Sequence, residues 1–184
     1  MQVTATEIPA VKILTPKKFG DNRGFFSETY NRATFRDLAG IDVEFCQDNQ
    51  SLSVEKGVVR GLHYQLPPMA QAKLVRVTRG AILDIAVDIR RGSPTFGRHV
   101  AAVISAENWR QIFIPIGFAH GFATLEPNTE VLYKVSNCYS PKDERGIRWN
   151  DPKLGIAWGI DESAAVMSEK DRKYPALAEV TDLF

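Results

Sequence analysis

The chain has 184 residues, with 23 Lys and Arg against 22 Asp and Glu, and its formal net charge is +1. This balance argues against a protein that binds nucleic acid or a membrane surface through its overall charge, and it leaves room for a local basic pocket. The length, together with a hydrophobic content of 44%, predicts a globular protein with one domain over residues 1–184.

Two further features concern the compartment. No apolar run approaches the roughly 18 residues that cross a bilayer, and the N-terminus lacks the apolar core of a signal peptide. We therefore expect a cytoplasmic protein. The two cysteines, Cys46 and Cys138, are far apart in the sequence and do not resemble a disulfide framework, so we expect both thiols to be reduced.

One helix is predicted near the N-terminus, between Asn31 and Gly40. The side chain of Asn31 can cap its first turn, and Gly40 can end it in a left-handed conformation. Phe35 and Leu38 are three residues apart, so they share one face of this helix.

Strand patterns dominate the middle of the chain. Short segments rich in β-branched and aromatic residues alternate with Gly, Pro, Asn or Ser. They cover residues 73–79, 81–89, 99–105, 109–115, 118–125 and 130–136. Because no helical pattern separates them, they predict an antiparallel sandwich or barrel. From about residue 140 onward, we expect loops and short helices packed on the barrel.

The segment Gly57–Gln65 holds the densest chemistry. Its histidine, His63, follows Arg60 and precedes Lys73 by ten residues. A lone histidine is more often a hydrogen-bonded core residue, but two cations beside it favour a site that binds an anionic substrate and moves a proton. A histidine base usually needs a carboxylate at its other ring nitrogen. The candidates are Asp84, Asp88 and Asp171, among which strand parity does not choose.

Strand parity makes two further predictions. Arg60 and His63 differ by three, so a regular strand would direct them to opposite faces. Either a bulge at Gly61 redirects one of them, or Arg60 serves another purpose. If the faces that carry Tyr133 and His120 point inward, a phenol and an imidazole lie among apolar walls at the mouth of the barrel.

Several other kinds of site are disfavoured. Gln65 stands two residues after His63, where a metal-binding barrel would often have a second histidine, and the remaining histidines at 99 and 120 are scattered. We therefore predict no metal site. No Ser or Cys lies in an elbow-like turn, and the glycine patterns that bind ATP or NAD are absent.

Six segments match the motifs of one enzyme family in the same order. They are Asp21–Glu28, Gln47–Ser51, Gly57–Gln65, Gln71–Val75, Ile114–Phe122 and Ile147–Pro152. Through them the chain resembles the dTDP-4-dehydrorhamnose 3,5-epimerases, from about Ile13 to Leu177. The resemblance implies an all-β, cupin-type antiparallel jelly roll (a double-stranded β-helix) with a few short peripheral helices. It also implies a homodimer that exchanges N-terminal strands, with no metal or organic cofactor.

The resemblance also implies a substrate and residue roles. The substrate would be dTDP-4-dehydro-6-deoxy-D-glucose, inverted at C3 and C5 to dTDP-4-dehydro-L-rhamnose. His63 matches the family's base, and Tyr133 matches its proton donor. Lys73 matches the residue beside the keto oxygen, and Asp171 matches the carboxylate paired with the base. The positions that match those holding the nucleotide sugar are Arg23, Glu28, Gln47, Asp48, Asn49, Arg60, Lys73, His120, Glu144 and Lys170.

The implied chemistry also makes demands on the pocket. A ketone at C4 acidifies the protons on C3 and C5, and Lys73 can stabilise the resulting enolate oxygen in a dry site. We expect three aromatic side chains to exclude water there, namely Phe118, Phe122 and Trp109. If the N-terminal strands are exchanged, Arg23 and Glu28 serve the site of the neighbouring subunit.

Two alternative functions fit part of this pattern. A single-centre epimerase or ketoisomerase acting on a related dTDP-4-keto sugar would need a different placement of the acid, and Tyr133 argues against it. A non-catalytic sugar-nucleotide-binding barrel would keep the phosphate-binding arginines. Such a barrel has no need of His63 and Lys73 together with that tyrosine.

Overall fold

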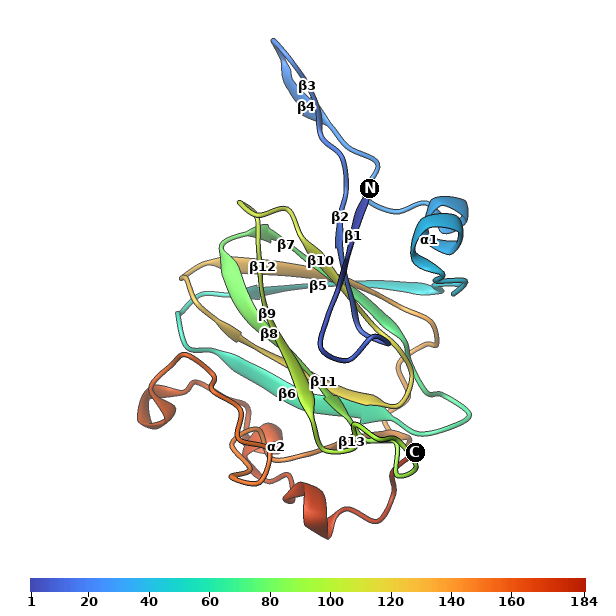
Figure 1. Ribbon diagram of the computed structural model, residues 1–184. Coiled ribbons are helices and arrows are strands. Elements are labelled where there is room, and N and C mark those ends of the chain that lie inside the picture. Colours follow the sequence, from blue (N-terminus) through green and yellow to red (C-terminus); the bar gives the residue numbers. More distant parts are fainter.

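A computed structural model describes residues 1–184 and shows two antiparallel β-sheets packed against each other (Figure 1). The six-stranded sheet consists, in spatial order, of β1 (Gln2–Ala5), β2 (Lys12–Thr15), β10 (Gln111–Ile114), β7 (Lys73–Arg79), β12 (Thr129–Val135) and β5 (Gln47–Ser53). The five-stranded sheet consists of β13 (Glu144–Gly146), β6 (Val59–Gln65), β11 (Phe118–Thr124), β8 (Ala81–Asp88) and β9 (His99–Ser105). The antiparallel arrangement predicted from the sequence is confirmed.

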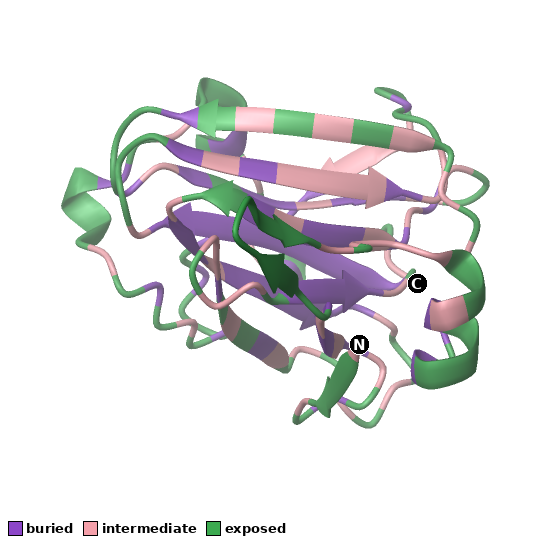
Figure 2. Ribbon diagram, turned by 90° about the horizontal axis from the view of Figure 1, so that it is seen from above, coloured by how far each residue is buried: buried purple, intermediate pink, exposed green.

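Two smaller parts lie outside these sheets. A hairpin of β3 (Phe19–Asp21) and β4 (Gly24–Phe26) projects from the body, and its residues are exposed (Figures 1 and 2). The helices are α1 (Arg32–Ala39), α2 (Glu169–Arg172) and the 3-10 turns Glu162–Ala164 and Leu177–Glu179. None of them is long and apolar enough to span a membrane.

The interior is apolar and lies in two layers. Between the sheets, Val75 and Val131 of the six-stranded sheet pack in one cluster with Ile82 and Ile104 of the five-stranded sheet, and all four side chains are fully buried. Burial of each such side chain contributes about 1.5–3 kcal/mol. The central strands are accordingly buried in Figure 2.

The second apolar layer lies on the other face of the five-stranded sheet. The chain after β13 covers this face, where Trp149 and Trp158 pack in one cluster with Leu62. The indole N–H of Trp158 donates to the carbonyl of Trp149 at 2.9 Å, which fixes the covering segment. This packing holds the C-terminal residues of the site in place.

Helix α1 has the predicted ends, and it buries only one narrow face. Asn31 Oδ1 accepts a hydrogen bond from the Thr34 N–H at 3.2 Å, and Gly40 ends the helix with a φ of 64°. Phe35 packs with Ala39, one full turn later, against the outer face of the six-stranded sheet. Leu38, which was expected to share a face with Phe35, is 57% exposed. The only buried side chains of this helix are therefore those of Phe35 and Ala39.

Some strand limits also differ from the prediction. Trp109 adopts a φ of 60° and its N–H bonds to the carbonyl of Ser105, so the chain turns there and β10 begins only at Gln111. The pattern also missed β5, because Gln47–Ser53 is polar and lies at the edge of its sheet, with one face exposed.

The predicted bulge at Gly61 is present. In the pairing of β6 with β11, His63 lies opposite His120 and Arg60 lies opposite Phe122, so three steps on one strand match two on the other. Gly61 has a φ of 117°, and a Cβ atom there would lie 2.6 Å from the carbonyl oxygen of His120. Only glycine permits this approach. The extra residue directs Arg60 and His63 into the same cavity.

Candidate active site

A cavity between the two sheets brings most of the candidate residues together. It consists of two adjoining hollows of about 340 and 490 Å³, and both are lined by His63, Lys73, Tyr133 and Glu144. His63 lies on β6 and Glu144 on β13, in the five-stranded sheet, whereas Lys73 and Tyr133 lie on β7 and β12 of the other sheet. The candidate base therefore faces a cation and a phenol across the cavity.

The carboxylate beside His63 is Asp171. His63 Nε2 and Asp171 Oδ1 are 2.9 Å apart, and the second oxygen of Asp171 accepts the N–H of Gly61 at 3.1 Å. Burial alone would raise the pKa of this carboxyl, but the hydrogen bonds from His63 and Gly61 outweigh it and hold the pKa below its ordinary value. Asp171 thus stays ionised and orients the ring, and the other ring nitrogen has no protein partner.

Asp84 is paired with the second histidine. His120 Nε2 and Asp84 Oδ2 are 2.9 Å apart, and both side chains are almost wholly buried. Burial lowers the pKa of His120, and the charge of Asp84 offsets this only in part. His120 lines the larger hollow, so a second imidazole lies at the site as predicted.

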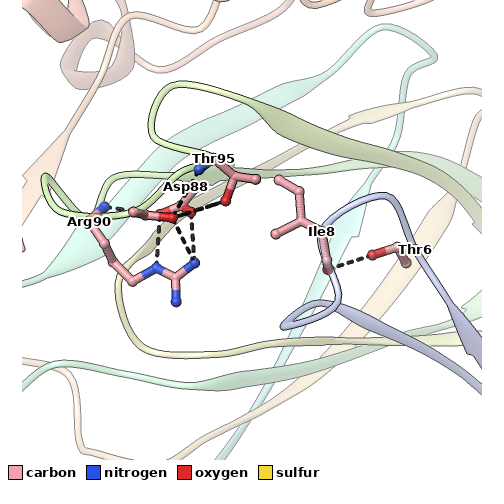
Figure 3. Close-up of polar contacts among 6 residues, drawn as sticks. Thr6, Ile8, Asp88, Arg90 and Thr95 are labelled. Carbon is pink, nitrogen blue, oxygen red and sulfur yellow. Dashed lines mark hydrogen bonds and ion pairs between the residues drawn. The ribbon is translucent and has the colours of Figure 1, made fainter.

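Asp88 has a structural task at the turn between β8 and β9 (Figure 3). It accepts two hydrogen bonds from the Arg90 guanidinium at 2.9 and 2.7 Å, and others from the hydroxyls of Ser93 and Thr95. Burial would raise the pKa of this carboxyl, but these bonds outweigh it and the pKa is lowered. Nearby, the Thr6 hydroxyl donates to the carbonyl of Ile8. Asp88 is therefore unavailable to His63.

Lys73 and Tyr133 hold protons that a reaction could use. Burial lowers the pKa of Lys73 to about 8, while the charges of Asp84 and Glu144 oppose that shift. Burial raises the pKa of Tyr133, although the nearby Arg60 lowers it somewhat. Near pH 7, Lys73 is therefore mostly an ammonium and Tyr133 a protonated phenol.

Further polar and charged side chains line the cavity around these groups. Gln47 and Asn49 line the smaller hollow from β5 and are joined by a hydrogen bond of 2.7 Å. Glu144 forms an ion pair with Lys170, and burial, which would raise the pKa of Glu144, is outweighed by that contact. Arg60 lines the larger hollow, as does Lys170.

Three of the predicted binding residues lie elsewhere in this chain. Arg23 is on the projecting hairpin, where it pairs with Asp21 at 2.6 Å and its side chain is 84% exposed. Glu28 accepts a hydrogen bond from Asn31 and lines neither hollow. Asp48 forms an ion pair with Lys134, on the face of β5 opposite to Asn49. It lines neither of these two hollows but a separate one of about 320 Å³, which Asn49 and Tyr133 also line, so its role in binding stays a prediction.

The aromatic walls were predicted only in part. Phe122 lines the larger hollow, but Phe118 lies in the core between the sheets. Trp109 packs edge to face against Phe25 at 5.1 Å, beside the hairpin, and lines neither hollow. Its position follows from the turn before β10, which directs the indole away from the cavity.

Sequence reasoning missed two tyrosines at the site. The ring of Tyr174 lies edge to face with the His63 imidazole, with centroids 5.6 Å apart, and burial raises the pKa of Tyr174 to about 12. Its ring packs on Gly146, where a Cβ atom would lie 2.3 Å away. The hydroxyl of Tyr139 donates to Glu144 at 2.7 Å. A usable signal for Tyr139 was an exposed aromatic residue in a polar loop directly after a strand.

The side chains also bear on metal binding. No three or more His, Cys, Asp and Glu side chains gather in a group that could hold a metal ion. Each cavity histidine is engaged by one carboxylate, and Gln65 bonds to backbone carbonyls of Met69 and Cys138. That no metal is used stays a prediction, which chelation can test.

Known proteins are similar to this chain in sequence and in fold over nearly its whole length. Residues 5–179 match the dTDP-4-dehydrorhamnose 3,5-epimerase family. A relative of that name from Sinorhizobium fredii is 50% identical over 180 residues, which cover 98% of this chain and 91% of the relative. The crystal structure of RmlC from Legionella pneumophila, a dTDP-6-deoxy-D-glucose-3,5-epimerase in complex with dTDP-4-keto-L-rhamnose, is 45% identical with a TM-score of 0.92, and the match covers 97% of this chain and 94% of that one.

A more distant structure is that of ChmJ, a 3'-monoepimerase from Streptomyces bikiniensis in complex with dTDP-quinovose. It is 34% identical with a TM-score of 0.87, and the match covers 95% of this chain and 87% of that one.

These similarities first define a class: the chain is an isomerase with the jelly-roll fold of the cupins. Within that class it belongs to the dTDP-4-dehydrorhamnose 3,5-epimerase family, as its six motifs predicted. The cavity between the sheets is therefore the candidate active site of an epimerase.

Proposed function

We propose that this protein inverts C3 and C5 of dTDP-4-dehydro-6-deoxy-D-glucose, and so forms dTDP-4-dehydro-L-rhamnose by proton transfer through an enolate. The observation that supports this most strongly is the arrangement of the cavity. The His63–Asp171 pair lies on one side, and Lys73 and Tyr133 lie on the other.

His63 is the proposed base. Asp171 holds one ring nitrogen, which leaves the other to accept a proton from C3 or C5 of the sugar. The electron pair of the broken C–H bond moves toward the C4 ketone, and negative charge collects on that oxygen. Lys73 stabilises the charge as an ammonium in a site from which most water is excluded.

Tyr133 is the proposed acid. Inversion requires that the new proton reach the carbon from the ring face opposite to the base. Tyr133 lies on the other sheet from His63, and burial keeps its hydroxyl protonated. The same exchange at the second carbon completes the reaction, and each cycle leaves the base protonated and the acid deprotonated until solvent resets them.

The reaction moves protons without a change in oxidation state, so we propose that it requires neither an organic cofactor nor a metal ion. The diphosphate requires positive charge, which Arg60 and Lys170 supply at the larger hollow. Exhaustive chelation should leave turnover intact. A loss of activity that one added divalent ion restores would overturn this proposal.

We further propose a cytoplasmic homodimer that exchanges N-terminal strands, with residues 1–184 of each subunit forming one domain. The supporting observation is the projecting hairpin, on which Phe25 and Phe26 are 55% and 70% exposed. Exposed aromatic residues on such an arm favour contact with a second subunit. The partner's Arg23 and the partner's Glu28 would then complete this site.

The test is incubation with the 4-keto sugar nucleotide in D2O, with the ring protons followed by NMR. We expect deuterium at both C3 and C5, together with the inverted product. Because a 3'-monoepimerase shares the fold, deuterium at one carbon alone would favour a single-centre epimerase. Binding without any exchange would indicate a non-catalytic sugar-nucleotide-binding barrel.

A further inference from the structure

The two cysteines lie side by side at the edge of the cavity. Cys46 directly precedes β5, and Cys138 follows the end of β12. These strands pair antiparallel with Val135 opposite Gln47, so the chain before one strand runs beside the chain after the other. The N–H of Cys46 donates to the carbonyl of Val135 at 3.0 Å. As a result, the two Sγ atoms are 3.8 Å apart, and both residues are exposed.

We propose that Cys46 and Cys138 are a dithiol modification site at which a peroxide forms a reversible disulfide. A disulfide bond is about 2.05 Å long, so the two sulfur atoms have to approach by less than about 2 Å. Cys138 lies in the irregular segment between β12 and β13, which can supply that movement without disrupting a sheet. Both thiols are open to a small oxidant.

The reaction balances with hydrogen peroxide as the oxidant. One thiol loses its proton, and its thiolate attacks a peroxide oxygen. The O–O bond breaks, a sulfenic acid forms, and the hydroxide that leaves takes up the proton as water. The second thiol then attacks the sulfenic sulfur, which closes the S–S bond and releases a second water. The two cysteines together lose two electrons and two protons, and a dithiol reductant reverses the change.

The modification is coupled to the site by short contacts. Tyr139, the residue after Cys138, donates its N–H to the Gln47 side chain at 3.1 Å and its hydroxyl to Glu144 at 2.7 Å. The carbonyl of Cys138 accepts a hydrogen bond from Gln65 at 3.2 Å. Tyr139 and these three partners all line the smaller hollow. A disulfide would therefore fix the rim of the hollow and draw Tyr139 toward β5.

This coupling predicts a change in activity, which rests on the proposed epimerase function. A rim that is covalently closed moves less when the sugar nucleotide enters. Oxidation should therefore lower kcat/KM by about tenfold, equivalent to about 1.4 kcal/mol. The effect should be smaller on kcat, because His63 and Tyr133 lie within the strands β6 and β12, whose pairing with neighbouring strands holds them in place.

The experiment treats the full-length protein with hydrogen peroxide and follows two readouts, intact mass with thiol alkylation after denaturation, and deuterium exchange into the sugar. We expect the mass to fall by two hydrogen atoms and both thiols to disappear. Exchange should slow at low substrate and recover with dithiothreitol. The control variants Cys46→Ser and Cys138→Ser should keep basal activity, should not form the internal disulfide and should keep full activity after gentle oxidation.

The outcomes separate the two proposals. Two alkylatable thiols after peroxide treatment would show that the pair is not a disulfide site. A disulfide that forms with kcat/KM unchanged would overturn the coupling to the site. A reduced protein that exchanges no ring protons would contradict the epimerase proposal alone, because the mass measurement tests the disulfide without reference to activity.

Discussion

The molecule contains two histidine–aspartate pairs with the same geometry and different surroundings. In each pair an Nε2 atom lies 2.9 Å from a carboxylate oxygen. The side chain of His63 is 28% exposed, whereas that of His120 is 8% exposed and its partner Asp84 is fully buried. An imidazole that exchanges protons with a ligand has to be reachable. Access to the cavity, rather than the paired carboxylate, therefore distinguishes His63, the proposed base, from His120.

Replacing each histidine tests this comparison and should give the largest effect. Without its base, the variant His63→Ala should lose proton abstraction, a contribution of about 10²–10⁴-fold in rate. It should still bind dTDP, because the diphosphate is held by cations. The matched control, His120→Asn, should keep far more exchange. Equal loss in the two variants, measured as deuterium incorporation by NMR, would remove the distinction between the pairs.

A variant of Tyr133 tests the side of the cavity opposite to His63. The variant Tyr133→Phe keeps the ring and its packing but lacks the hydroxyl proton. His63 should still remove a proton and return one to the same ring face. Solvent deuterium should therefore enter the sugar while inverted product falls strongly. Undiminished epimerisation by this variant, seen in the NMR spectrum of the product, would mean that another group is the acid.

The next largest effect should be a dependence of kcat/KM on pH that arises from the titration of Lys73. Burial lowers the pKa of this ammonium to about 8, so the charge that stabilises the enolate is present below that pH and lost as pH rises through it. The value of kcat/KM should fall about tenfold per pH unit well above pH 8. In the variant Lys73→Arg, whose cation does not titrate in this range, the alkaline decline should disappear. A decline at the same pH in that variant would assign it to another group.

The smallest effect concerns Arg60, which the bulge directs toward the cavity. Arg60→Ala should weaken dTDP binding by about 1.5–3 kcal/mol, the usual contribution of one hydrogen bond to a charged group. Lys134→Ala is a matched control, because Lys134 pairs with Asp48 away from the hollow that holds His63. Calorimetry that shows the same affinity for both variants would place the Arg60 side chain outside the binding site.

Local patterns were sufficient to predict much of the fold and the centre of the site. Strand spacing predicted an antiparallel sandwich or barrel, and strand parity named a bulge at Gly61 as one of two alternatives for Arg60 and His63, the one that is present. These features depend on neighbours in the sequence. Parity predicted that Tyr133 lines the cavity on the condition that its face points inward, and Tyr133 does line it.

Local patterns could not predict features that depend on contacts between distant parts of the chain. Parity could not choose the carboxylate beside His63, because Asp171 is 108 residues away and arrives on a segment outside the sheets. Trp109 was placed in the wrong environment because its positive φ ends the predicted strand. The two cysteines meet only because β12 pairs with β5, which no spacing in the sequence indicates.

The distance in sequence between His63 and Asp171 also has a consequence during translation. Ribosomes add about 5–20 residues per second, so the 108 residues between them take several seconds to emerge. A nascent chain that ends before Ser168 contains every strand of both sheets, yet its imidazole has no carboxylate to orient it. Competence for proton transfer is therefore among the last properties that the growing polypeptide acquires.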